Sequence, residues 1–85
     1  MVGTLPVGGR LMRLSDWEER CTDQDSCYLI VRLEACRLRW YDQDGHAWTR
    51  EFANATVWPV REDAYQTARQ VGGLLNLYTR AEGLF

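Results

Sequence analysis

Three cysteines and one histidine are the residues of this chain that could bind a metal ion or form a nucleophile–base pair. Cys21, Cys27, Cys36 and His46 are separated by five, eight and nine residues. Structural zinc sites use ligand pairs separated by two to four residues, so these spacings match no common zinc motif. A Cys–His nucleophile also needs a cleft and a third group that orients the base. His46 follows a turn glycine, where an exposed polar residue is usual. We therefore predict no metal, no cofactor and no enzymatic activity.

Length and composition limit the remaining classes of protein. The 85 residues, 46% of them hydrophobic, suffice for one domain with one small core. The chain has no apolar run of membrane-spanning length, and its first ten residues do not resemble a secretory signal. We therefore expect a cytoplasmic protein with reduced thiols. Cys21 and Cys27 flank one loop, which leaves open whether those two are paired or free.

Charge is distributed unevenly along the chain, although the net charge is only −2. Residues 15–27 hold five acidic residues against Arg20 alone, whereas residues 28–41 hold three arginines against Glu34. The acidic stretch is either a solvated helix and loop or a surface that engages a basic partner. The partner-binding residues in the second interpretation are Asp16, Glu19, Asp23 and Asp25.

The order of predicted elements indicates an α+β domain, with an antiparallel meander of three to five strands packed on one face by one helix. Residues 1–13 are expected to form an extended arm, and 14–22 a short helix with a capping box from Ser15 to Glu18. The meander is predicted over 28–58, with a short fourth strand at 56–58. A helix over 59–72 begins at Pro59 and ends at Gly72. Residues 74–80 form a possible last strand.

Two turns set the expected register of the meander. A three-residue loop at 43–45, closed by Gly45 in the left-handed region, places Trp40 opposite Trp48 and Arg37 opposite Glu51. The turn near Ala35 lacks the usual turn residues, so a single bent strand over 28–41 is the alternative to a hairpin. The predicted core comprises Leu29, Val31, Leu33, Leu38, Trp40, Trp48, Phe52, Trp58, Ala64, Ala68 and Val71. Arg50 would face this core, unless it reaches solvent at the sheet edge or the strand bulges.

The opposite sheet face is the strongest candidate surface for binding. It would carry Tyr28, Ile30, Arg32, Arg37, Arg39 and Tyr41. Arg32 and Arg37 would lie opposite each other, a like-charge pair that an anionic partner could neutralise. Arginine and tyrosine are enriched at binding hot spots and also stack on single-stranded nucleic acid. Alternatively, Glu51 satisfies Arg37 and the arm or the acidic helix covers this face.

The succession of hairpin, glycine turn, Trp-bearing strand and Ala-rich helix resembles small phage-encoded β-meander-plus-helix proteins. Over residues 28–72, the resemblance rests on Trp40, Asp44-Gly45, Trp48, Ala55-Thr56-Val57-Trp58, Ala64 and Ala68. It is a resemblance of architecture, and it implies an inhibitor of a host defence protein, of the anti-CRISPR kind, that acts by stoichiometric occlusion. The alternative is a single-stranded RNA- or DNA-binding domain, which the net negative charge disfavours. Homodimerisation through an edge strand also stays open.

Overall fold

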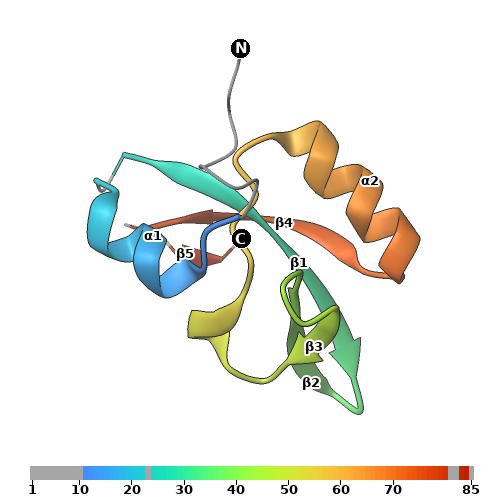
Figure 1. Cartoon of the computed structure of the whole chain (residues 1–85). Coiled ribbons are helices and arrows are strands. Elements are labelled where there is room, and N and C mark those ends of the chain that lie inside the picture. Colours follow the sequence, from blue (N-terminus) through green and yellow to red (C-terminus); the bar gives the residue numbers. More distant parts are fainter. Residues whose placement is uncertain (1–10, 23, 81–82, 85) are drawn as a thin grey trace.

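The computed structural model describes residues 11–22 and 24–80, together with the backbone of residues 83 and 84. In chain order the elements are α1 (Leu14–Arg20), β1 (Ser26–Glu34), β2 (Arg37–Asp42), β3 (Ala47–Thr49), the 3-10 helix η2 (Phe52–Asn54), α2 (Arg61–Val71), β4 (Leu74–Thr79) and β5 (Gly83–Leu84). One antiparallel sheet of order β3-β2-β1-β4-β5 contains all five strands (Figure 1). The predicted α+β class with a meander is confirmed, while most of the predicted arm lies outside the described residues.

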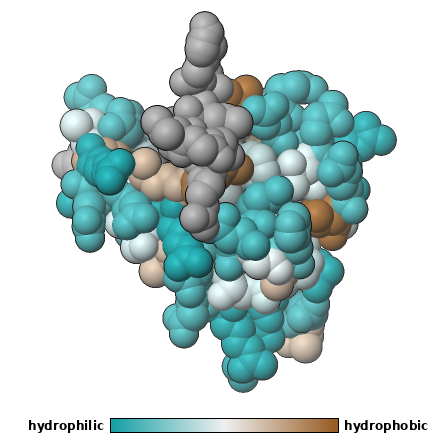
Figure 2. All heavy atoms as spheres, in the orientation of Figure 1, coloured by the Kyte–Doolittle hydropathy of each residue, from teal (hydrophilic) through white to brown (hydrophobic). Residues whose placement is uncertain are grey.

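Side chains of β1 point alternately to the two faces of the sheet, and both faces are covered. On what we call the α2 face, Ile30 and Tyr41 pack with Trp58 and with Ala64 and Ala68 of the helix. A second cluster lies on the opposite α1 face and contains Leu14, Cys27, Leu29, Ala55, Val57 and Tyr78, with Trp17, Trp40 and Phe52 packed against it. The fold therefore has two small cores separated by the sheet. Seen from the side shown in Figure 2, hydrophobic residues form small separate groups on a largely hydrophilic surface.

Helix α2 ends where the sequence predicted, at a glycine. Gly72 has φ +78°, in the left-handed region that glycine adopts without steric cost, and the next amide, of Gly73, donates to the Ala68 carbonyl at 2.9 Å. Gly73 lies so close to the sheet that a Cβ there would stand 2.6 Å from Trp48 Cη2. Because Gly73 has no side chain, the end of α2 can pack directly against the sheet.

Helix α1 begins differently from the prediction. Arg13 is its N-cap residue and makes no side-chain capping bond, so the predicted capping box from Ser15 to Glu18 is wrong. The helix begins at Leu14, whose fully buried side chain contributes to the α1-side core. Glu18 instead accepts a hydrogen bond from the Tyr78 hydroxyl, which joins α1 to β4.

The turn between β2 and β3 contradicts the predicted register. It contains four residues, Gln43–His46, and the left-handed residue is His46, with φ +48°, instead of Gly45. Trp40 therefore pairs with Thr49 and Tyr41 with Trp48, which places the two tryptophans on opposite faces of the sheet. The third strand ends at Thr49, and the expected pairing of Arg37 with Glu51 does not occur.

The hairpin of β1 and β2 is confirmed, and the single bent strand is excluded. Its two-residue turn, Ala35-Cys36, has φ of +51° and +64°, the type I′ pattern. Val31 pairs with Trp40 and Leu33 with Leu38, so the register is shifted by two residues from the prediction but keeps each side chain on its predicted face. The predicted fourth strand at 56–58 is instead two isolated bridges, Arg13 with Thr56 and Tyr28 with Trp58.

Candidate functional site

The Arg–Tyr face predicted as an open binding surface is the face on which α2 packs. Tyr41 is 5% exposed, Ile30 is buried and Tyr28 is half-buried in contact with the same cluster. The side chain of Arg39 keeps only 14% of its surface exposed. The prediction of an exposed face is therefore wrong, because α2 packs over β1 and β4 and the rings of Trp48 and Trp58 cover Tyr41 of β2. Of this predicted set, Arg37 alone is classed as exposed.

A carboxylate of the same chain reduces the repulsion between the arginines of this face. Arg32 lies opposite Arg39 instead of Arg37, and Glu34 forms an ion pair with Arg32 and approaches Arg39 Nε at 3.7 Å. The Arg32 guanidinium also stacks 4.3 Å above the Trp48 ring. Glu34 thus offsets, within the chain, part of the positive charge that the sequence predicts an anionic partner to neutralise. The sequence did not identify this role because the register of the hairpin was shifted by two.

The predicted acidic surface stays a prediction. Asp16, Glu19 and Asp25 are exposed, and the Asp25 carboxylate accepts a hydrogen bond from the Thr22 amide at 2.9 Å. Asp23 lies outside the described residues. The described carboxylates, of Asp16, Glu19 and Asp25, do not form a group that could hold a metal ion.

Three exposed leucines gather on the α1 face, at the end of the sheet remote from α1. Leu33, Leu38 and Leu74 have exposed fractions of 66%, 43% and 69%. Leu33 and Leu38 are cross-strand partners, and Leu74 pairs with Val31, two residues before Leu33 on β1. Cross-strand partners lie side by side on one face of a sheet. We call these three residues the leucine patch.

The leucine patch is exposed because the elements on the α1 face are short. Helix α1 has seven residues and η2 has three, and both pack near Leu29 and Trp40. Nothing among the described residues covers the hairpin end of the same face. The prediction that Leu33 and Leu38 belong to the core is wrong. The sequence does contain one signal of this exposure. The helix that precedes the meander is too short to cover the whole of one sheet face.

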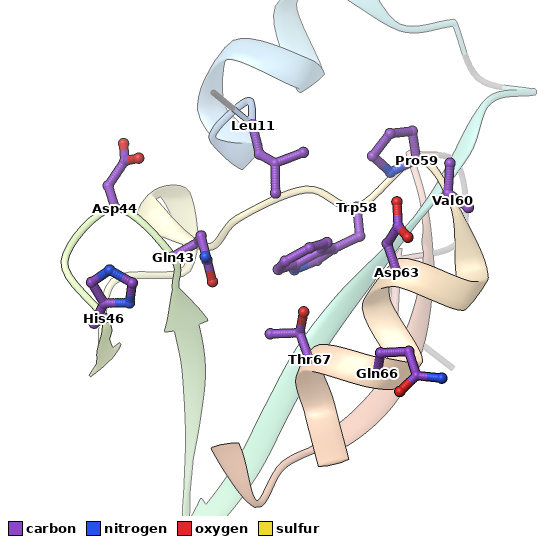
Figure 3. A pocket seen from close by; sticks show the side chains of 10 residues that line it. All are labelled: Leu11, Gln43, Asp44, His46, Trp58, Pro59, Val60, Asp63, Gln66 and Thr67. Atoms are coloured by element: carbon purple, nitrogen blue, oxygen red, sulfur yellow. The ribbon is translucent and has the colours of Figure 1, made fainter. Parts of the chain in front are cut away.

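A shallow groove of about 490 Å³ lies between the Gln43–His46 turn and the first turns of α2 (Figure 3). The buried Trp58 indole occupies its centre, with Asp63 and Thr67 of α2 beside it. His46 stands at the rim, and within residues 11–22 and 24–80 no hydrogen bond joins its imidazole to a carboxylate. The groove therefore brings polar groups together without aligning a nucleophile with a base.

The three cysteines carry free thiols in two different environments. Cys21 and Cys27 are buried near Glu18, and Cys36 is exposed at the tip of the hairpin. Burial, reinforced by the nearby Cys21 and Glu18, raises the pKa of Cys27 to about 12, so its reactive thiolate is scarce at neutral pH. In the described ranges, no three His, Cys, Asp or Glu residues are placed to hold a metal ion.

None of the described helices combines the length and apolar character needed to cross a bilayer. Comparisons with protein-family models, with curated proteins and with solved structures find no match to this chain. The leucine patch is therefore the candidate functional site on physical grounds alone.

Proposed function

We propose that this chain is a small, non-catalytic protein-binding module that acts by occupying a surface of its partner. The observation that carries the proposal is the leucine patch, with Leu33, Leu38 and Leu74 adjacent on one sheet face and 43–69% exposed. Single exposed apolar residues are common on soluble proteins, but adjacent ones are typical of interfaces. Their position on paired strands holds the three side chains in a fixed arrangement, which lowers the entropic cost of binding.

The free energy available from the patch is enough to anchor a complex. Complete burial of an exposed leucine side chain is worth about 1.5–3 kcal/mol. Because the three leucines are only partly exposed, their burial together is worth roughly 3–5 kcal/mol. This is a factor of about 10² to 4 × 10³ in Kd, so the rest of the affinity comes from surrounding contacts.

The proposal is tested by size-exclusion chromatography and titration calorimetry with a partner recovered on the full-length chain from its native host. We expect a one-to-one complex. Leu33→Ser combined with Leu74→Ser should weaken it by at least thirtyfold, with little change in the free energy of unfolding. Leu77→Ser is the matched control, because Leu77 is 36% exposed on the same strand as Leu74 but on the α2 face.

An unchanged Kd in the double variant would show that the patch is not the binding surface. A Kd that rises equally in the double variant and in Leu77→Ser would indicate a general loss of structure. Self-association of the isolated chain that the double variant abolishes would assign the patch to homodimerisation, the alternative considered from the sequence.

The resemblance to small phage proteins suggests a narrower target, a host defence protein in the host cytoplasm, inhibited in an anti-CRISPR-like manner. The identity of the recovered partner and the genes adjacent to this one test that hypothesis. We do not extend the proposal to single-stranded nucleic acid. Burial of Tyr41 and coverage by α2 leave the Arg–Tyr face without the open stacking platform that such binding needs.

A further inference from the structure

The hairpin of β1 and β2 extends away from both helices and ends in a tight turn (Figure 1). All six residues from Leu33 to Leu38 are exposed. The type I′ geometry at Ala35 and Cys36 matches the right-handed twist of the flanking strands, so the tip is narrow. A protruding element of this shape contacts a partner on both of its faces if it enters a concave site.

The two faces of the hairpin differ in chemistry. One presents Leu33 and Leu38, with Leu74 beside them on β4. The other presents the cross-strand pair Glu34 and Arg37, flanked by Arg32 and Arg39. Among the described residues of the hairpin, Glu34 supplies one carboxylate for three guanidinium groups, which leaves an excess of positive charge on the face opposite the leucines. Arg37 is exposed on this face, whereas the side chains of Arg32 and Arg39 are 35% and 14% exposed.

We propose that the hairpin inserts into a cleft of the partner protein that has one apolar wall and one acidic wall. The apolar wall would cover the leucine patch, and the carboxylates of the other wall would meet Arg37 and the excess charge beside it. Insertion of this kind explains how a chain of this size blocks a larger protein. This inference rests on the proposed function and specifies how its binding surface is used.

Two other kinds of binding partner fit the two faces of the hairpin less well. A second copy of the chain would bring the same excess of arginine to the contact, where like charges repel. A nucleic acid would match the arginines but would leave the leucines against phosphates and sugars, where they gain little. A protein cleft satisfies both faces.

Cys36 at the tip allows a direct test, because the other two thiols are buried. We would attach benzophenone-4-maleimide to Cys36 of the full chain, irradiate the complex with the recovered partner and map the adducts by mass spectrometry. We expect adducts inside one cleft of the partner that contains aspartate or glutamate. Attachment of a polyethylene glycol maleimide at Cys36 should abolish the complex, whereas the same reagent on Q70C in a C36S background should not, because Gln70 lies on the exposed side of α2.

The acidic wall is tested by charge reversal. Arg37→Glu should weaken binding at least tenfold and reduce its dependence on salt, while the matched reversal Arg50→Glu at another exposed arginine should change Kd by less than twofold. If the leucine variants abolish the complex but Arg37→Glu and the Cys36 adducts do not affect it, the hairpin does not insert and the proposed function stands. If the leucine variants, Arg37→Glu and the Cys36 adducts all leave binding unchanged, or no partner is recovered, both proposals fail. Adducts to nucleic acid would overturn the insertion.

Discussion

Replacement of Gly73 by alanine should be among the most destabilising small changes in this protein. An added Cβ would stand 2.6 Å from Trp48 Cη2, 2.7 Å from Ile30 Cγ2 and 3.1 Å from the Val31 carbonyl oxygen. Carbon atoms in contact prefer about 3.5–4.0 Å, so an indole and a buried isoleucine must each move by about 1 Å. Both belong to the α2-side core, where there is little room to move.

Overpacking of this kind costs about 1–3 kcal/mol. In a domain of this size, a loss of about 2 kcal/mol lowers Tm by roughly 8–16 °C. The neighbouring Gly72 is the matched control, since a Cβ there meets nothing within 4 Å and the only penalty is its left-handed φ of +78°. Gly72→Ala should therefore cost about 1 kcal/mol, the smaller of the two losses.

Thermal and urea denaturation followed by circular dichroism measure both losses. The second part of the test is Trp48→Phe, which removes Cη2. If the clash is the cause, the double variant Gly73→Ala/Trp48→Phe should be more stable than the sum of the single losses by at least about 0.5 kcal/mol. Equal losses at Gly72 and Gly73, or strict additivity with Trp48→Phe, would refute the assignment of a close approach at Gly73.

Three further predictions concern the cores, the hairpin turn and alkaline pH. Leu29→Ala should cost about 2–5 kcal/mol of unfolding free energy, whereas Leu33→Ala should cost less than about 0.5 kcal/mol, because only the first is buried; similar losses in urea denaturation would contradict the two-core packing. Cys36→Gly should raise Tm by a few degrees by relieving φ of +64°, while Cys36→Ala should not; a gain from both would mean that the thiol, not the backbone, is responsible. Burial raises the pKa of Cys27 and Tyr78 to about 12, with the Glu18 hydrogen bond contributing for Tyr78. The folded state therefore holds protons that the unfolded chain loses from about pH 9, so the free energy of unfolding should fall between pH 9 and 12. Tyr78→Phe with Cys27→Ala should flatten that decline, and a profile as steep as in the parent would exclude these two groups as its cause.

The type of each main element was predictable because local signals were strong. Period-two alternation marked Tyr28–Leu33 and Arg37–Tyr41, and helical spacing of Ala64 and Ala68 before Gly72 marked α2. These patterns depend on short-range sterics and on one buried face, and neither requires knowledge of distant contacts. The class of fold and the approximate positions of β1, β2 and α2 followed from them.

The register of β3 was not predictable from the same signals. Gly45 is the residue that turn statistics favour for a left-handed position, but His46 takes it, and histidine is among the non-glycine residues that tolerate this region. One extra turn residue moves Trp48 to the other face. The longer turn also makes a contact distant in sequence, in which the Gln43 amide donates to the Thr56 hydroxyl at 2.8 Å.

The candidate site was mispredicted because hydropathy does not distinguish a buried leucine from an exposed one. Leu33 and Leu38 alternate correctly with the core positions of β1 and β2, and only the length of the elements above them leaves them exposed. Conversely, Arg32 and Arg39 are residues of a type expected on an exposed surface, but both interact with Glu34, and Arg32 also stacks on Trp48. Whether a strand residue is buried depends on which elements pack over it, and the sequence of the strand alone does not determine that.

The central strand β1 has a consequence for how the protein is made. Its first half has no partner among its immediate neighbours in sequence, because Ser26 pairs with Thr79 and Tyr28 with Trp58 and Leu77. When the ribosome has synthesised only the hairpin of β1 and β2, neither of the two hydrophobic cores can be completed. An isolated hairpin of this size has only marginal stability in water. Folding has to wait until the last strands are synthesised, and a prematurely terminated chain without β4 should be degraded instead of accumulating.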